Sequence, residues 1–126
     1  MGAIVLLSSR YNVKESIDRL VILLQRSGMI VYARINRQIE AKWYGRLARP
    51  MEFILFDDPR LSGPLVERIP QIALCFPMRI IAWIDEQGGC QVAYKDPMVV
   101  MKEYNIDRGG HEWNHLRRVI SRSLSE

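Results

Sequence analysis

The chain has 126 residues, of which 48% are hydrophobic and 25% are charged, and its formal net charge is +4. These proportions are typical of a globular domain, and they exclude a disordered chain, a collagen-like repeat and a coiled coil. The length fits one domain over residues 1–126, with about 107–126 as a C-terminal helical extension. The basic balance permits weak attraction to polyanions without defining a site.

The first half of the chain is expected to alternate strands and helices. Asn12 can cap a helix, with Glu15 reaching back to it, and Gly28 supplies the left-handed residue that ends the helix. The expected elements are a strand at 4–7, a helix from Asn12 to Gly28, a strand at 29–34, a short helix from Asn36 to Gly45 and a buried strand at 51–56.

The second half begins with a proline-rich segment, 60–78, which we predict to be mostly loop, with one helical turn opening at Pro64. Residues 79–84 and 90–94 are typical of a hairpin. Asp96 and Pro97 predict a helix to about Tyr104, and the last helix is expected over 112–124. Strands that run into a meander and are flanked by helices favour an α+β fold with about five strands.

Apolar runs and cysteines limit the surroundings in which we expect the protein. The apolar run at 3–7 is too short for a membrane span or a signal peptide, so we expect a cytoplasmic protein with no membrane partner. Cys75 and Cys90 form no Cys-x-x-Cys pair, and we interpret both as core residues. We expect no cofactor.

The sharpest motif is His111-Glu112-Trp113-Asn114-His115, which has the H-E-x-x-H pattern of zinc metalloproteases. Helical spacing, however, places both histidines opposite the apolar stripe of the last helix, beside cationic residues. A zinc site requires neutral imidazoles and a third ligand in a partly dry cavity. A solvated helix face is therefore the favoured interpretation, and His111 and His115 are weak metal candidates.

A basic segment, 34–49, interleaves five cationic side chains with Trp43 and Tyr44, and this pattern can pair phosphates with stacking platforms. An ordinary charged helix face gives the same pattern, and the charges do not cluster into a run. We expect nucleic-acid binding to be weak if it exists.

The proline-rich segment is the best place for a small-ligand site, because its prolines hold an irregular backbone rigidly. Free N–H groups at a helical turn opened by Pro64 would suit a small anion or a carboxylate. The opposing interpretation is that Ser62 or water caps these groups. The candidate ligand-binding residues are Arg60, Ser62, Gly63, Pro64, Trp83 and Tyr94.

Residues spread from Asn12 to about Ile106 carry a resemblance to a known family. They include Val31-Tyr32-Ala33-Arg34-Ile35, Gly63-Pro64-Leu65, Trp83 with Asp85, and Tyr94 with Asp96-Pro97. In their order and spacing the chain resembles the bacterial and archaeal domain-of-unknown-function 302 family. The resemblance implies a TATA-box-binding-protein-like α+β fold, a curved and mainly antiparallel sheet packed on helices, and it implies no activity.

Several polar positions depart from the usual pattern of that family. Asn36 and Cys75 stand where the family has aspartates, and Tyr104 stands where it has a histidine. A polar site shared by the family would be lost or changed here. We therefore expect a non-enzymatic binding or interaction domain, a homodimer with a small-ligand or anion cleft. The alternatives are a zinc-dependent hydrolase that uses 111–115 and a weak nucleic-acid binder that uses 34–49.

Overall fold

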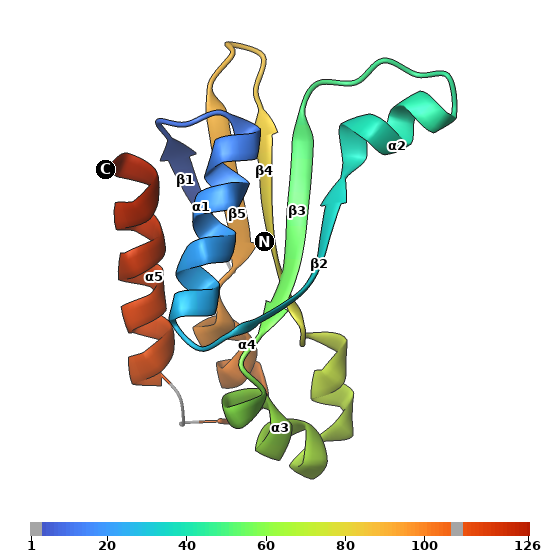
Figure 1. The fold of residues 1–126 in the computed structure, drawn as a ribbon. Coiled ribbons are helices and arrows are strands. Elements are labelled where there is room, and N and C mark those ends of the chain that lie inside the picture. The colour runs from blue at the N-terminus through green and yellow to red at the C-terminus, as the bar shows by residue number, and fades with distance from the viewer. Residues whose placement is uncertain (1–3, 107–109) are drawn as a thin grey trace.

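The computed structural model describes residues 4–106 and 110–126, and they form a two-layer α+β fold (Figure 1). Five antiparallel strands are arranged in the order β1-β5-β4-β3-β2. The strands are β1 (Ile4–Ser9), β2 (Ile30–Asn36), β3 (Met51–Asp57), β4 (Met78–Ile84) and β5 (Cys90–Lys95). The predicted fold class is confirmed.

Helices cover one face and one end of the sheet. They are α1 (Val13–Arg26), α2 (Arg37–Trp43), α3 (Pro59–Arg68), the 3-10 helix η1 (Pro70–Leu74), α4 (Pro97–Glu103) and α5 (Gly110–Ser125). Figure 1 shows α1 and α5 side by side against the sheet, whereas α3 and α4 lie at its lower end and α2 projects at the opposite end. Within the described residues, no helix has both the length and the apolar character that a bilayer span requires.

Helix α1 forms as its sequence predicts. The Asn12 side chain accepts a hydrogen bond from the backbone N–H of Glu15 at 2.8 Å, which satisfies an otherwise free donor of the first turn. At the other end Gly28 adopts a φ of 83°, and the N–H of Met29 returns to the Leu24 carbonyl at 3.0 Å. This is the hydrogen-bonding pattern of a Schellman ending, which glycine favours.

Helix α5 presents an apolar stripe to the core. Its buried residues are Trp113, Leu116, Ile120 and Leu124, while His115 is exposed. The stripe predicted from helical spacing is confirmed. It joins the core that α1 makes with the helix-facing side chains of the sheet, so α5 is one of the two helices that close this face.

The prediction of a loop over 60–78 is wrong, because this segment forms α3 and η1. Asp58 caps α3 by accepting from the Arg60 N–H at 3.0 Å, and Pro59 occupies the first turn, where a missing N–H costs nothing. Pro70 likewise occupies the first turn of η1, although no side chain caps that helix. Pro64 does not open a helical turn, since it lies inside α3. The prolines of this segment were a poor guide, because Pro70 stands at a helix start and Pro64 is accommodated inside α3.

The other face of the sheet carries exposed apolar side chains. Leu6 of β1 is 60% exposed and Ile4 is 49% exposed, and Trp83 of β4 is half-buried. Alternation along each strand sends these side chains away from α1 and α5. The homodimer expected from the sequence stays a prediction. A second copy could cover these side chains in it.

Candidate functional site

The structure brings Arg60 and Ser62 next to two aspartates. Arg60 donates to both carboxylate oxygens of Asp58, from Nε and Nη2 at 2.9 Å each, and the Ser62 hydroxyl donates to Asp57 at 2.6 Å. Gly63 lies in the helix, and a Cβ added there would meet open space. Anion binding by these residues stays a prediction, and the geometry does not favour it, because carboxylates already accept from both donors.

Asp57 is a buried carboxylate whose Oδ1 has no hydrogen-bond partner in the described part of the chain. Burial raises its pKa, against the lowering effect of the Ser62 hydroxyl. Because the folded state favours the protonated carboxyl, Asp57 makes its full contribution to stability at a pH below the ordinary carboxyl pKa. That contribution is lost as the pH rises through the raised pKa of the folded state.

Asp57→Asn is therefore expected to raise the melting temperature at pH 7, because it keeps an acceptor oxygen for Ser62 and removes the buried charge. At pH 3, where the wild-type carboxyl is largely protonated, the difference should nearly disappear. Thermal unfolding of both proteins at the two pH values is the measurement. A variant that is less stable at pH 7 would contradict the assignment.

Trp83 and Tyr94 do not share a cleft. Tyr94 pairs with Ile80 on the helix side of the sheet, whereas Trp83 pairs with Met51 and Gln91 on the other side. Tyr94 is buried, and burial raises its pKa to about 12. Of the two aromatic candidates, Trp83 is the one that lines a hollow on the surface.

The H-E-x-x-H motif begins α5. His115 is exposed, and the side chain of His111 lies outside the described part of the structure. Among the described residues, no group of three or more His, Cys, Asp or Glu side chains could hold a metal ion.

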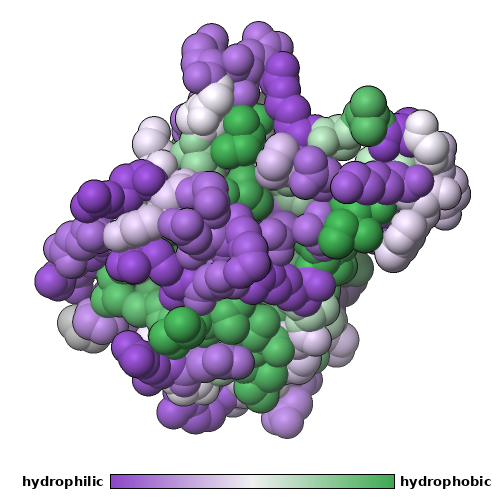
Figure 2. All heavy atoms as spheres, turned by 45° about the horizontal axis from the view of Figure 1, so that its top comes forward, coloured by the Kyte–Doolittle hydropathy of each residue, from purple (hydrophilic) through white to green (hydrophobic). Residues whose placement is uncertain are grey.

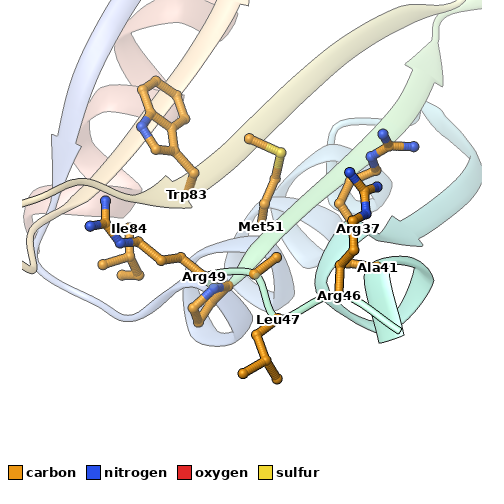
Figure 3. A pocket seen from close by; sticks show the side chains of 10 residues that line it. Arg37, Ala41, Arg46, Leu47, Arg49, Met51, Trp83 and Ile84 are labelled. Atoms are coloured by element: carbon orange, nitrogen blue, oxygen red, sulfur yellow. The ribbon is translucent and has the colours of Figure 1, made fainter. Parts of the chain in front are cut away.

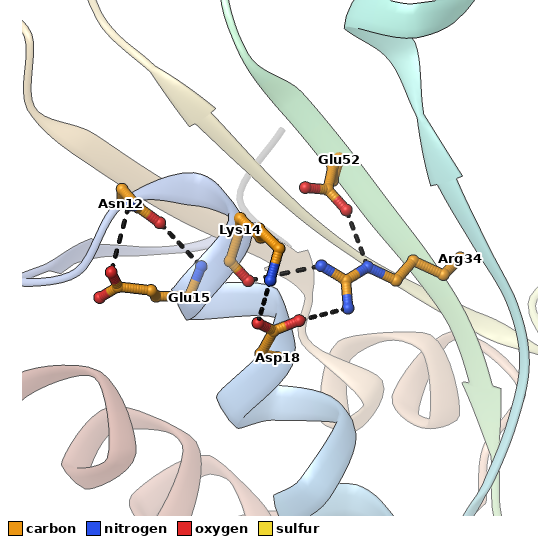
Figure 4. Close-up of polar contacts among 6 residues, drawn as sticks. All are labelled: Asn12, Lys14, Glu15, Asp18, Arg34 and Glu52. Atoms are coloured by element: carbon orange, nitrogen blue, oxygen red, sulfur yellow. Dashed lines mark hydrogen bonds and ion pairs between the residues drawn. The ribbon is translucent and has the colours of Figure 1, made fainter.

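The basic segment 34–49 divides into two parts. Arg34 turns toward the helix layer, where it donates to Asp18 at 2.6 Å and to Glu52 at 2.8 Å (Figure 4). Lys14 and Arg34 together lower the pKa of Asp18. Arg34 thus belongs to a structural ion-pair network, and only the residues from Arg37 onward lie at the projecting end.

A surface hollow of about 330 Å³ lies where that projecting end meets β4. Its lining combines three arginines with apolar residues; the ten are Arg37, Ala41, Arg46, Leu47, Ala48, Arg49, Pro50, Met51, Trp83 and Ile84. Figure 3 shows Arg37 and Arg46 on one side and Arg49 reaching across toward Ile84, with Leu47 directed outward. Among the described lining residues, none is acidic.

Backbone contacts set the position of the arginines. Gly45 has a φ of 72°, and the N–H of Arg46 returns to the Ala41 carbonyl at 3.0 Å, which is again a Schellman ending. The Gln38 amide donates to the Ala48 carbonyl at 3.0 Å, and the Ile84 N–H donates to the Pro50 carbonyl at 3.2 Å. These bonds fold residues 45–50 back against the end of β4.

The three arginines differ in how they are paired. Arg37 donates to Glu40 at 2.9 Å, whereas neither Arg46 nor Arg49 forms an ion pair within residues 4–106 and 110–126. The pKa of Asp85 is lowered mainly by the Gly89 N–H and then by the Gln91 amide, and Arg49 contributes least. Arg46 and Arg49 therefore keep guanidinium donors for a ligand.

Comparison with known proteins places the fold in a family. A family model described as "Domain of unknown function DUF302" matches residues 5–123. The chain belongs to the DUF302 family. The predicted resemblance is confirmed. A crystal structure of an uncharacterised conserved DUF302 protein from Bacillus stearothermophilus superposes with a TM-score of 0.78, over 98% of this chain and 97% of that chain. At 13% identity, this likeness shows the shared fold alone.

Relatives with curated names come from Brucella. Chains named "Fluoride-specific ion channel FluC 1" from Brucella suis biovar 1 (strain 1330) and Brucella abortus biovar 1 (strain 9-941) are each 29% identical over 105 residues. The match covers 83% of this DUF302 chain and 41% or 39% of theirs. The chain thus spans about two fifths of the length of these relatives.

Sequence reasoning found the parts of the hollow and did not join them. Arg46 and Arg49 belonged to the nucleic-acid hypothesis, and Trp83 belonged to the small-ligand hypothesis. The register that pairs Met51 with Trp83 brings them together. The proline just before β3 marks where the chain enters that strand, but no signal in the sequence gives the pairing register.

Proposed function

We propose that this DUF302 protein is a binding module for a small organic anion, a carboxylate or phosphate attached to a flat apolar group. The observation that carries the proposal is the composition of the hollow, in which three arginines line one cavity without an acidic neighbour among the described lining residues. Such a site attracts negative charge and gives it several donors.

The chemistry of the lining defines the ligand further. A guanidinium presents parallel N–H donors that match the two oxygens of a carboxylate or phosphate. Met51, Pro50 and the half-buried Trp83 offer apolar and aromatic surface for the remainder of the ligand. The volume of about 330 Å³ is at the lower end of the range for small-molecule sites.

The curated relatives are compatible with a module of this kind. In the Brucella chains the similar segment is part of a longer protein named as a fluoride-specific ion channel. A ligand-binding domain can be joined to another functional unit in this way, and channel activity is not proposed for this chain. Fluoride is a useful probe, because a single small ion would leave the apolar part of the hollow unused.

The proposal is tested by titrating benzoate, phenyl phosphate, inorganic phosphate and fluoride into the protein by calorimetry. We expect phenyl phosphate or benzoate to bind more tightly than the inorganic ions. The Arg46→Ala/Arg49→Ala double variant should bind about tenfold more weakly or worse, since each charge-assisted hydrogen bond contributes about 1.5–3 kcal/mol.

Arg26→Ala/Arg68→Ala is the matched control, because it also removes two charges, and Arg26 and Arg68 are exposed arginines in the last turns of α1 and α3, outside the hollow. It should bind the probes as the wild type does. Equal weakening in the two double variants would mean that net charge alone attracts the anions, and it would refute the site.

A further inference from the structure

The projecting end of the molecule exposes large apolar side chains. We define the α2 arm as residues 37–50, which comprise α2 and the segment that leads to β3. In this arm Leu47 is 96% exposed, Tyr44 is 79% exposed and Trp43 is 71% exposed, and Ile39 is nearly half exposed. Exposed apolar residues gathered in one place, rather than scattered singly, mark an interaction surface.

The same arm is strongly basic. Arg37, Lys42, Arg46 and Arg49 oppose a single acidic residue, Glu40, so the arm carries a net charge of 4 − 1 = +3. Figure 2 shows hydrophobic and hydrophilic atoms side by side on the lobe at the upper right, where the arm lies. Aromatic and aliphatic side chains mixed with cations are typical of surfaces that enter the headgroup region of an anionic bilayer.

Shape and charge favour an anionic bilayer over a second copy of this chain or a single-stranded nucleic acid as the partner of the arm. The arm projects to one side at the end of the fold where the β4–β5 turn also lies, so a fluid, flat surface can receive its tip without a matching cavity (Figure 1). A second copy of a chain with net charge +4 offers no overall charge complement. A single-stranded nucleic acid would stack on Trp43 and Tyr44, but it would give no comparable environment to Leu47.

We propose that the α2 arm docks this protein on the surface of an anionic bilayer. Trp43, Tyr44 and Leu47 enter the interface between headgroups and acyl chains, while Lys42 and Arg46 contact lipid phosphates. The sequence-based expectation of no membrane partner rested on the lack of a spanning segment, and surface docking needs none. Arg46 and Leu47 line the hollow as well, but Trp43 and Tyr44 do not, so a substitution at Trp43 tests the docking proposal separately from the proposed anion site.

Vesicle co-sedimentation tests the proposal. The purified protein is mixed with vesicles of phosphatidylcholine alone or of phosphatidylcholine with phosphatidylglycerol. We expect binding to the mixed vesicles, weaker binding to the neutral ones, and a loss on adding salt. Leu47→Asp should bind the mixed vesicles about tenfold more weakly or worse. The substitution removes apolar area that the bilayer would cover, and it adds a negative charge that anionic lipids repel.

Leu74→Asp is the matched control, because Leu74 of η1 is 90% exposed and the substitution changes the net charge equally. It should bind as the wild type does within about twofold. Trp43→Ser, which leaves the hollow intact, should also lose vesicle binding while it still binds the soluble organic anions. That pair of readouts keeps the failure of one proposal distinct from the failure of the other.

Three results would overturn the docking proposal. One is a wild-type protein that fails to bind the mixed vesicles, and another is equal weakening in Leu47→Asp and Leu74→Asp. The third is a different partner: binding of single-stranded DNA that Trp43→Ser abolishes, or a wild-type dimer that Leu47→Asp dissociates, in either case without vesicle binding.

Discussion

Phe56→Ala is expected to lower the free energy of unfolding by about 3–5 kcal/mol, because it deletes a large buried ring and leaves a cavity. Phe56 is 1% exposed, and its strand, β3, lies between β2 and β4. Its ring is among the largest fully buried side chains of the core that α1 and α5 close. A substitution there removes contacts on which both layers depend.

Denaturant unfolding followed by circular dichroism measures this loss, provided that the slope with denaturant is unchanged. Tyr44→Ala is the matched aromatic control, since Tyr44 is largely exposed, and its effect should stay within about 0.5 kcal/mol. A loss below about 1 kcal/mol for Phe56→Ala would show that the ring is not in the core.

Arg34→Ala is expected to cost about 2–3 kcal/mol, less than a fully buried pair because the Arg34 side chain is one-third exposed. The loss arises because Glu52 remains buried after its partner is removed. Glu52 is buried, and Arg34 is its ion-pair partner at 2.8 Å, so the substitution leaves a carboxylate without its compensating charge.

A double-mutant cycle separates this effect from lost packing. In the Arg34→Ala background, Glu52→Gln should restore part of the stability, whereas in the wild type the same change should be destabilising. The measurement is the unfolding free energy of the four proteins. Additive effects of the two substitutions would contradict the ion pair, because independent sites show no coupling energy.

Local chemistry made most of the fold predictable. Asn12, Asn36 and Gly28 act at helix ends as their types suggest, and the apolar periodicity of α1 and α5 matches their buried faces. The segment 60–78 was mispredicted because proline is favoured in the first turn of a helix and disfavoured in its interior. The cap by Asp58 shows that Pro59 begins a helix, but an Asp-Pro pair in a sequence is also typical of turns.

The candidate site was less accessible from the sequence, because it depends on pairing between distant segments. Arg49 and Trp83 become neighbours through the β3–β4 register and through the bond from Ile84 to Pro50. Tyr94 was placed with Trp83 although alternation along the hairpin sends the two to opposite faces. Composition gave the types of residue that bind anions, and only the sheet shows which of them meet.

The most direct test of the central claim is a titration of isotopically labelled protein with phenyl phosphate, followed by amide chemical shifts. If the hollow binds the anion, the shifts that move first and saturate together should belong to residues 46–51 and 83–84, and they should remain still in the Arg46→Ala/Arg49→Ala variant. Saturating shifts that gather elsewhere on the fold, or that persist unchanged in the double variant, would contradict the proposed function.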